Sequence, residues 1–238
     1  MAAHFTPETM RFLRGLAKHN DRDWFEERRP IYEKHLKQPM QAVIEAINTD
    51  LSGFAPEYVR PPHKIAMRIF RDTRFSPDKR PYKTNLAAWW ARQGLEKTSA
   101  PGFFLQIGPA GGMVAAGIYA PEREDLLRTR RWLADHHERY REEAAPLLKA
   151  KGNLPAMQPI PPNALTRNPK GFAPDHPASD LLRSRNWGFS AALAAEDALQ
   201  PGFPDLALAH FRRLAPFVSL LTEPFLSADA DPRRGLRL

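Results

Sequence analysis

An α+β fold is predicted by two features of the sequence. Apolar residues recur at helical spacing near the N-terminus, in the middle and near the C-terminus, whereas residues 64–119 contain consecutive extended segments with no helix between them. Strands that follow one another without a crossover helix form a mainly antiparallel sheet, and four or more strands are expected. The 238 residues suffice for one α+β domain over residues 1–238, with a frayed tail from about residue 228.

Helices are expected over most of the first quarter of the chain. The first begins at Thr6-Pro7-Glu8, where threonine suits the N-cap, proline the first helical position and glutamate the positive end of the helix dipole. Asn20-Asp21 separates it from a second helix, and Pro30 and Pro39 are expected to kink the chain or divide it. The expected apolar faces contain Met10, Leu13, Leu16 and Ala17, then Trp24, Phe25 and Tyr32, then Met40, Val43, Ile44, Ile47 and Leu51.

Four strands are predicted in the extended region. In KIAMRIFR (64–71), apolar residues at 65, 67 and 69 follow the two-residue period of a strand. The other candidates are TNLAAWW (84–90), GFFLQIG (102–108) and MVAAGIY (113–119). The last two flank Pro-Ala-Gly-Gly, which predicts a β-hairpin.

Helices return in the second half of the chain. Pro121-Glu122 starts a long helix whose regular part is expected to end near Pro146. Residues 152–177 contain seven prolines, which predicts an extended or functional loop. Ala178 to Arg185 predicts a short helix, and a last helix is expected to be interrupted at Pro216. The apolar residues of the long and last helices are Leu126, Leu133, Tyr140 and Leu147, then Leu206, Phe211, Leu214, Val218 and Leu221.

The composition excludes several classes of protein. The absence of cysteine excludes disulfides, a thiol nucleophile and thiolate zinc sites. No stretch reaches the roughly 18 uncharged apolar residues of a membrane span, and the N-terminus has no signal peptide, so we expect a soluble cytoplasmic protein with no membrane partner. Phosphate-loop, dinucleotide, nucleophile-elbow and zinc-protease motifs are all missing, and we therefore expect no cofactor and no metal site.

The positive charge is concentrated in one segment. The chain carries +8, and residues 60–83 hold eight basic residues and two acids, a net +6. The basic residues are Arg60, Lys64, Arg68, Arg71, Arg74, Lys79, Arg80 and Lys83, and the acids are Asp72 and Asp78. Local charge of one sign indicates an anionic partner at that place rather than a uniformly basic surface.

This segment is the candidate ligand-binding site. Arginine binds phosphate or carboxylate through two parallel hydrogen bonds, and an aromatic side chain such as Tyr82 or Phe75 adds a stacking surface. We expect an anionic, phosphate-bearing ligand, either a small molecule or nucleic acid. The candidate ligand-binding residues are Arg68, Arg71, Arg74, Lys79, Tyr82, Lys83 and, from a second segment, Lys170.

The second segment is Lys170-Gly171-Phe172 with Asp175-His176-Pro177. Asp175 or His176 is expected to cap the helix that follows, with Pro177 in its first turn. Alternatively, His176 lies beside the arginine-rich loop as an acid or base.

Two alternatives to simple anion binding stay open. In the first, the chain is an enzyme acting on an anionic substrate, with Asp72 or His176 moving a proton. In the second, the loop binds no small ligand: either its arginines form a structural ion-pair network with local acids and with the acids of the first helices, or its basic patch contacts an acidic face of another protein. The acids of the first helices are Asp21, Asp23, Glu26 and Glu27.

The run from Arg68 to Thr84 resembles the signature R-x-x-R-D-x-R-F-x-x-x-K-x-x-Y of domain of unknown function 2461, a widespread and mainly bacterial family. FLRGLAKHNDRDWFEERRPIYEKHLKQPM, PYKTN and KGFAPDHPASDLLR (170–183) are also similar to family segments, so the resemblance spans nearly the whole chain. It implies a conserved bacterial protein and no specific reaction. The signature positions are matched by Arg68, Arg71, Asp72, Arg74, Phe75, Lys79 and Tyr82.

Overall fold

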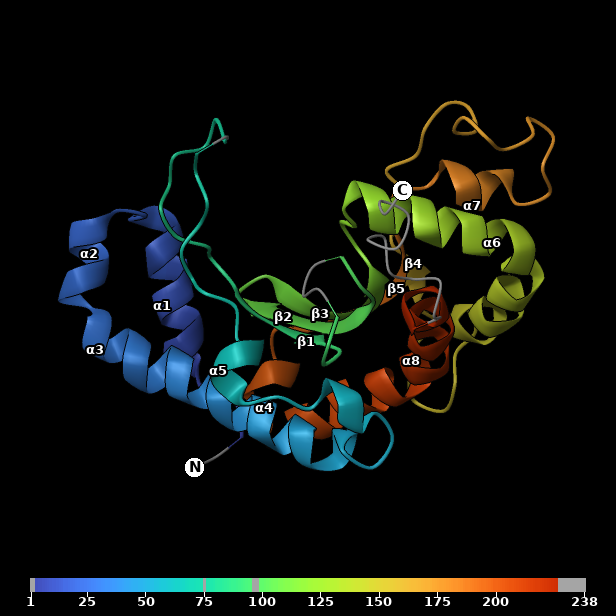
Figure 1. Cartoon of the computed structure of the whole chain (residues 1–238). Coiled ribbons are helices and arrows are strands. Elements are labelled where there is room, and N and C mark those ends of the chain that lie inside the picture. Colours follow the sequence, from blue (N-terminus) through green and yellow to red (C-terminus); the bar gives the residue numbers. More distant parts are fainter. Residues whose placement is uncertain (1–2, 75, 96–98, 227–238) are drawn as a thin grey trace. The chain divides into compact units, whose positions relative to one another are not determined.

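The computed structural model describes residues 3–74, 76–95 and 99–226 (Figure 1). Phe75 and the tail expected to be frayed from about residue 228 lie outside these residues. The chain divides into two compact units, each assembled from several segments. Unit 1 comprises the described residues of Met1–Trp90, Phe104–Val114 and Ala192–His210, and unit 2 those of Ala91–Phe103, Ala115–Ala191 and Phe211–Leu238.

The helices at the start of unit 1 confirm the helical first quarter. They are α1 (Pro7–Lys18), α2 (Arg22–Glu27), α3 (Arg29–Tyr32), the π-helix η1 (Glu33–Lys37) and α4 (Gln38–Leu51). The Asp21 side chain accepts a hydrogen bond from the Trp24 backbone N–H, 2.8 Å, and so caps α2. The π-helix ends two residues before Pro39, which has no N–H to donate to the preceding turn, and the Thr9 hydroxyl donates to the His35 carbonyl there at 2.6 Å.

The apolar faces predicted for these helices form the core of unit 1 with three exceptions, of which Trp24 and Tyr32 are half-buried. The stripe from Met40 to Leu51 is buried at each predicted position, and in α1 Met10, Leu13 and Leu16 are buried. Ala17 is exposed, whereas Phe12, which was not predicted, is buried.

The first predicted strand is wrong. KIAMRIFR begins in the short helix α5 (Pro62–Ile65) and continues as an extended segment with two isolated bridges, Ala66 to Ala88 and Phe70 to Tyr82. Two prolines at 61–62 favour a helical turn there, and Pro81 on the opposite side has no N–H to donate to a ladder. The burial pattern also differs, since Met67 is exposed.

The remaining strands confirm an α+β fold with an antiparallel sheet in the order β1-β2-β3-β5-β4. β1 (Leu86–Ala91), β2 (Gly102–Gly108) and β3 (Gly111–Ile118) match the predicted strands, and the last two form the predicted hairpin. Two strands were not predicted, β4 (Gln158–Pro159) and β5 (Trp187–Leu193), and they pair antiparallel, with Gln158 opposite Ser190.

The later helices are as predicted except at one proline. α6 (Arg123–Ala144) ends before Pro146, where the 3₁₀-helix η3 (Ala145–Leu148) begins, and α7 (Ser179–Arg183) follows the proline-rich loop. Two further 3₁₀-helices are η2 (Pro56–Tyr58) and η4 (Asp197–Leu199). α8 (Phe203–Leu226) runs through Pro216 without the expected interruption. Phe217 and Val218 directly after this proline are fully buried, so packing offsets the lost hydrogen bond.

No helix among the residues that the structure describes has both the length and the apolar character needed to cross a membrane.

A close backbone approach in unit 2 joins β3 to β5. Gly117 has φ +136°, and a Cβ atom there would lie 2.1 Å from the carbonyl oxygen of Trp187. A Cβ atom at Gly188 would lie 2.6 Å from the carbonyl oxygen of Ala116. Both glycines therefore allow two strands to approach more closely than side chains would permit.

We predict that Gly117→Ala destabilises the fold by more than about 4 kcal/mol, because the new methyl group overlaps backbone atoms. The control is Gly152→Ala, where φ is +59° but nothing lies within 4 Å of the new Cβ. That variant is expected to lose about 1 kcal/mol from the left-handed conformation alone. Urea unfolding measures both, and equal losses would contradict the close approach.

Candidate functional site

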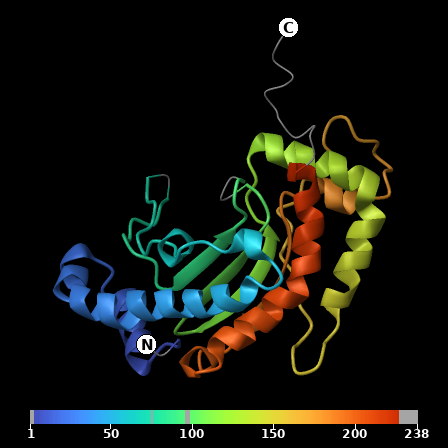
Figure 2. The same cartoon turned by 60° about the horizontal axis from the view of Figure 1, so that its bottom comes forward.

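The positively charged segment forms an extended arm in unit 1. We call residues 66–74 and 76–84 the basic arm; its two sides run next to each other in both views (Figures 1 and 2). Backbone hydrogen bonds join them, from Arg71 N–H to the Pro81 carbonyl and from Lys83 N–H to the Ile69 carbonyl, each 2.8 Å. The arm thus has the geometry of an antiparallel ribbon without a continuous ladder.

The base of the basic arm is fixed by Asn20. Its side-chain amide donates to the Tyr82 carbonyl, 3.1 Å, and its side-chain oxygen accepts from the Tyr82 N–H, 3.0 Å. The Tyr82 side chain is 2% exposed, and its ring stacks on Phe25 with 4.2 Å between centroids. Tyr82 anchors the arm, and its predicted contact with a ligand stays a prediction.

Both acids of the arm are paired with arginines of the arm. Asp72 accepts from the Arg74 guanidinium at 2.8 Å, while Asp78 lies 2.7 Å from Arg80 and 2.6 Å from Arg71. The side-chain hydrogen bond from Arg74, followed by the one from its backbone, lowers the pKa of Asp72 to about 2. The hydrogen bonds from Arg80, then Arg71, lower the pKa of Asp78 as well. Part of the predicted ion-pair network is therefore present within the arm.

The acids of the first helices have partners of their own. Glu26 pairs with Arg29 at 2.5 Å, and Glu27 pairs with Arg28 at 2.8 Å. The predicted network that would join these two carboxylates to the arm is thus replaced by pairs between neighbours in sequence. Such exposed pairs contribute little to stability.

The two lysines of the arm donate to backbone oxygens. The Lys79 ammonium donates to the Thr73 carbonyl at 3.0 Å, and the Lys83 ammonium donates to the Arg68 carbonyl at 3.1 Å. Burial, and then the charge of Arg68, lowers the pKa of Lys83. Arg68 and Lys83 therefore repel each other at the base of the arm, which is an electrostatic environment that an anion would relieve.

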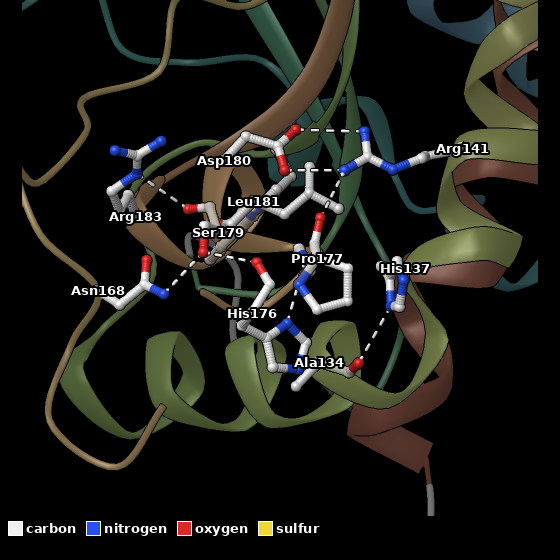
Figure 3. A network of polar contacts seen from close by, with 12 residues as sticks. Ala134, His137, Arg141, Asn168, His176, Pro177, Ser179, Asp180, Leu181 and Arg183 are labelled. Atoms are coloured by element: carbon white, nitrogen blue, oxygen red, sulfur yellow. Dashed lines mark hydrogen bonds and ion pairs between the residues drawn. The ribbon is translucent and has the colours of Figure 1, made fainter. Parts of the chain in front are cut away.

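The second predicted segment lies in unit 2, and Figure 3 shows its hydrogen bonds. His176 Nδ1 accepts from the Ala178 N–H at 3.1 Å, and the Ser179 hydroxyl donates to the His176 carbonyl at 2.6 Å. Of the two residues expected to cap this helix, His176 supplies an acceptor at the start of α7, whereas Asp175 is exposed. A ring nitrogen that accepts from a backbone N–H carries no proton, which leaves the proton on Nε2.

The surroundings of His176 are built from ordinary structural contacts. Its ring meets the His137 ring edge to face, with 5.9 Å between centroids. Arg141 on α6 donates to Asp180 on α7 at 2.8 Å and to the Pro177 carbonyl at 3.3 Å (Figure 3). Lys170 is exposed. The basic arm belongs to unit 1, so a common site for these residues and the arm stays a prediction.

Among the described residues, no group of three or more histidine or acidic side chains is arranged to hold a metal ion.

The family model described as "Conserved hypothetical protein (DUF2461)" matches residues 8–220, and the chain therefore belongs to this family. The match includes the basic arm and the segment around His176. Among curated proteins, none matches the chain.

We predict that Asp72 titrates with a pKa of about 2 in the folded protein and that Arg74→Ala returns it toward its ordinary 3.8. Because folding lowers this pKa, the ionised pair stabilises the fold above about pH 4, and this contribution is lost as the pH falls through about 2. The carboxyl chemical shift in NMR measures both values. Arg80→Ala is the control and should leave Asp72 unchanged; an unperturbed Asp72 in the wild type would show that the pair is not formed.

We predict that His176→Ala destabilises the protein by about 1 kcal/mol, since the N–H at the start of α7 loses its acceptor. His176→Asn keeps an acceptor and should retain most of the stability. Urea unfolding compares the three proteins. Equal stability of wild type and His176→Ala would contradict the structural role.

Proposed function

We propose that the basic arm binds a phosphate-bearing ligand, with Arg68 and Lys83 as its central cations. The observation that carries this proposal is the position of the two residues on facing sides of the arm: the Lys83 ammonium donates to the Arg68 carbonyl at 3.1 Å, and burial, then the charge of Arg68, lowers the pKa of Lys83. The carboxylates of the arm, Asp72 and Asp78, are already paired with other arginines. A phosphate bound between Arg68 and Lys83 would replace repulsion by two charge-assisted hydrogen bonds.

The ligand class supported best is the nucleotide unit, either free or in a single strand. Phe70 is 45% exposed, forms a bridge with Tyr82 on the opposite side of the arm and lies two residues from Arg68 in the sequence. Its ring is held from one side by Tyr82, 5.3 Å between centroids. An exposed ring beside cations is the arrangement that binds a base by stacking and its phosphate by charge.

An enzyme acting on the anion has less support. Asp72 is held ionised by Arg74, since its pKa is about 2, which makes it a weak proton acceptor at neutral pH. His176 uses Nδ1 to accept a backbone hydrogen bond. Neither Asp72 nor His176 therefore has the contacts expected of a general acid or base, and binding rather than catalysis is the function proposed.

We predict that a fluorescently labelled oligothymidylate of about 12 nucleotides binds the protein and that its affinity falls steeply between about 50 and 200 mM salt. Arg68→Ala should weaken binding about threefold to tenfold and reduce the slope against salt by about one, because one phosphate contact is lost. Phe70→Ala should weaken binding without changing the slope. Fluorescence anisotropy measures both quantities.

The matched control is Arg14→Ala, which removes one exposed positive charge from α1. It should bind like the wild type, and all three variants should keep Tm within about 3 °C. Nucleoside monophosphate and duplex DNA as competitors separate the free nucleotide from the strand. Absence of binding at low salt, or equal weakening by Arg14→Ala and Arg68→Ala, would refute the proposed site.

A further inference from the structure

Unit 2 contains a pocket that is separate from the basic arm. Its volume is ≈ 820 Å³, within the range of pockets that hold small organic ligands. It is lined by residues that follow β3, by the first turns of α6, by the loop after β4 and by the turn before β5. All of its lining residues belong to one unit.

A buried arginine forms the polar end of this pocket. Arg130 on α6 is 6% exposed, and its Nη2 donates to the Ser184 carbonyl at 2.8 Å. Its Nε is buried and has no hydrogen-bond partner in the part of the chain that the structure describes. A guanidinium is very seldom buried without a carboxylate or another anion, because its desolvation is costly.

A second arginine adds to this positive charge. Arg185 also lines the pocket, and its side chain is exposed. Burial, and then the charge of Arg185, lowers the pKa of Arg130. Among the ion pairs of the described residues, neither arginine has a carboxylate partner. The pocket therefore presents two like charges that an anion would neutralise.

The other residues that line the pocket indicate which further chemical groups a bound ligand carries besides its anionic group. Asn186 is 7% exposed and donates to the Pro161 carbonyl at 3.1 Å, but its Oδ1 is buried with no hydrogen-bond partner among the described residues. Leu126, Leu165 and Pro162 provide apolar surface. Tyr119, 66% exposed, also lines the pocket. A ligand that matches these groups carries an anionic group, an apolar body and a hydrogen-bond donor.

We propose that this pocket is a binding site for a small aromatic or similarly apolar organic anion, whose carboxylate or phosphate contacts Arg130 and Arg185. Its donor group faces Asn186 Oδ1, and its apolar body lies against the leucine and proline side chains. A purely structural role for Arg130 accounts for only the hydrogen bond to Ser184, and leaves its Nε, Asn186 Oδ1 and the charge of Arg185 unexplained. The proposal does not depend on the function of the basic arm.

The test uses 4-hydroxybenzoate and phenyl phosphate as probes in isothermal titration calorimetry and thermal shift assays. We expect saturable binding of at least one of them, weaker binding of inorganic phosphate, and none of neutral benzyl alcohol. Arg185→Ala should weaken binding about tenfold or more, since a charge-assisted contact is lost. Arg185 is exposed, so this variant should fold normally. Arg130→Lys should also weaken binding, because lysine cannot reproduce the planar fork of arginine.

The matched control is Arg131→Ala, which removes the neighbouring exposed charge on α6 and should bind both probes like the wild type. Arg68→Ala in the basic arm should likewise leave probe binding unchanged, which distinguishes the two sites. No saturable binding of either aromatic anion to the wild type at millimolar concentration would overturn the proposal. Equal affinity of the wild type and Arg185→Ala would overturn it as well.

Discussion

The close backbone approach between β3 and β5 is the constraint on which the architecture of unit 2 depends. Because Gly117 and Gly188 lack side chains, β5 can lie against β3 although a long helix and a proline-rich loop separate the two strands in the chain. This pairing brings the residue that follows β3, Tyr119, and the residues that precede β5, Arg185 and Asn186, to the same pocket. The pocket is thus a consequence of sheet topology, and any side chain at Gly117 would disturb it.

The sequence predicted those elements whose signal is local. Helix periodicity identified α1, α4 and α6, and the hairpin of β2 and β3 follows from the paired glycines between two extended runs. β5 was missed although Trp187, Phe189 and Leu193 follow the two-residue period of a strand, because glycine and alanine, which occupy three of its seven positions, have low strand propensity. The predicted strand over 64–71 failed because the prolines at 61, 62 and 81 prevent a regular ladder, although the alternation of apolar residues is real.

The candidate site, too, could be predicted from the sequence only where its signal is local. A charge count along the chain located the basic arm, because its cations are close in sequence. It could not predict which of them are paired: Arg74, Arg80 and Arg71 bind the two aspartates, whereas Arg68 and Lys83 repel each other. Nor could it locate the pocket in unit 2, since Arg130 and Arg185 are brought together only by the fold. The function of His176 at the start of α7 depends on one loop conformation that no sequence pattern specifies.

The arginines of the basic arm and the buried arginine of the pocket in unit 2 differ in their exposure to solvent. Arg74 and Arg80 are exposed, so water screens their charge and their pairs with aspartate add little stability. Arg130 has lost that screening, and within the described residues its guanidinium donates to the Ser184 carbonyl, directly after α7, and to no carboxylate. A buried guanidinium without an anionic partner lowers the stability of the free protein, and an anion that binds to it would restore that stability. The proposed anion at Arg130 would therefore couple the stability of the folded protein to the concentration of that ligand.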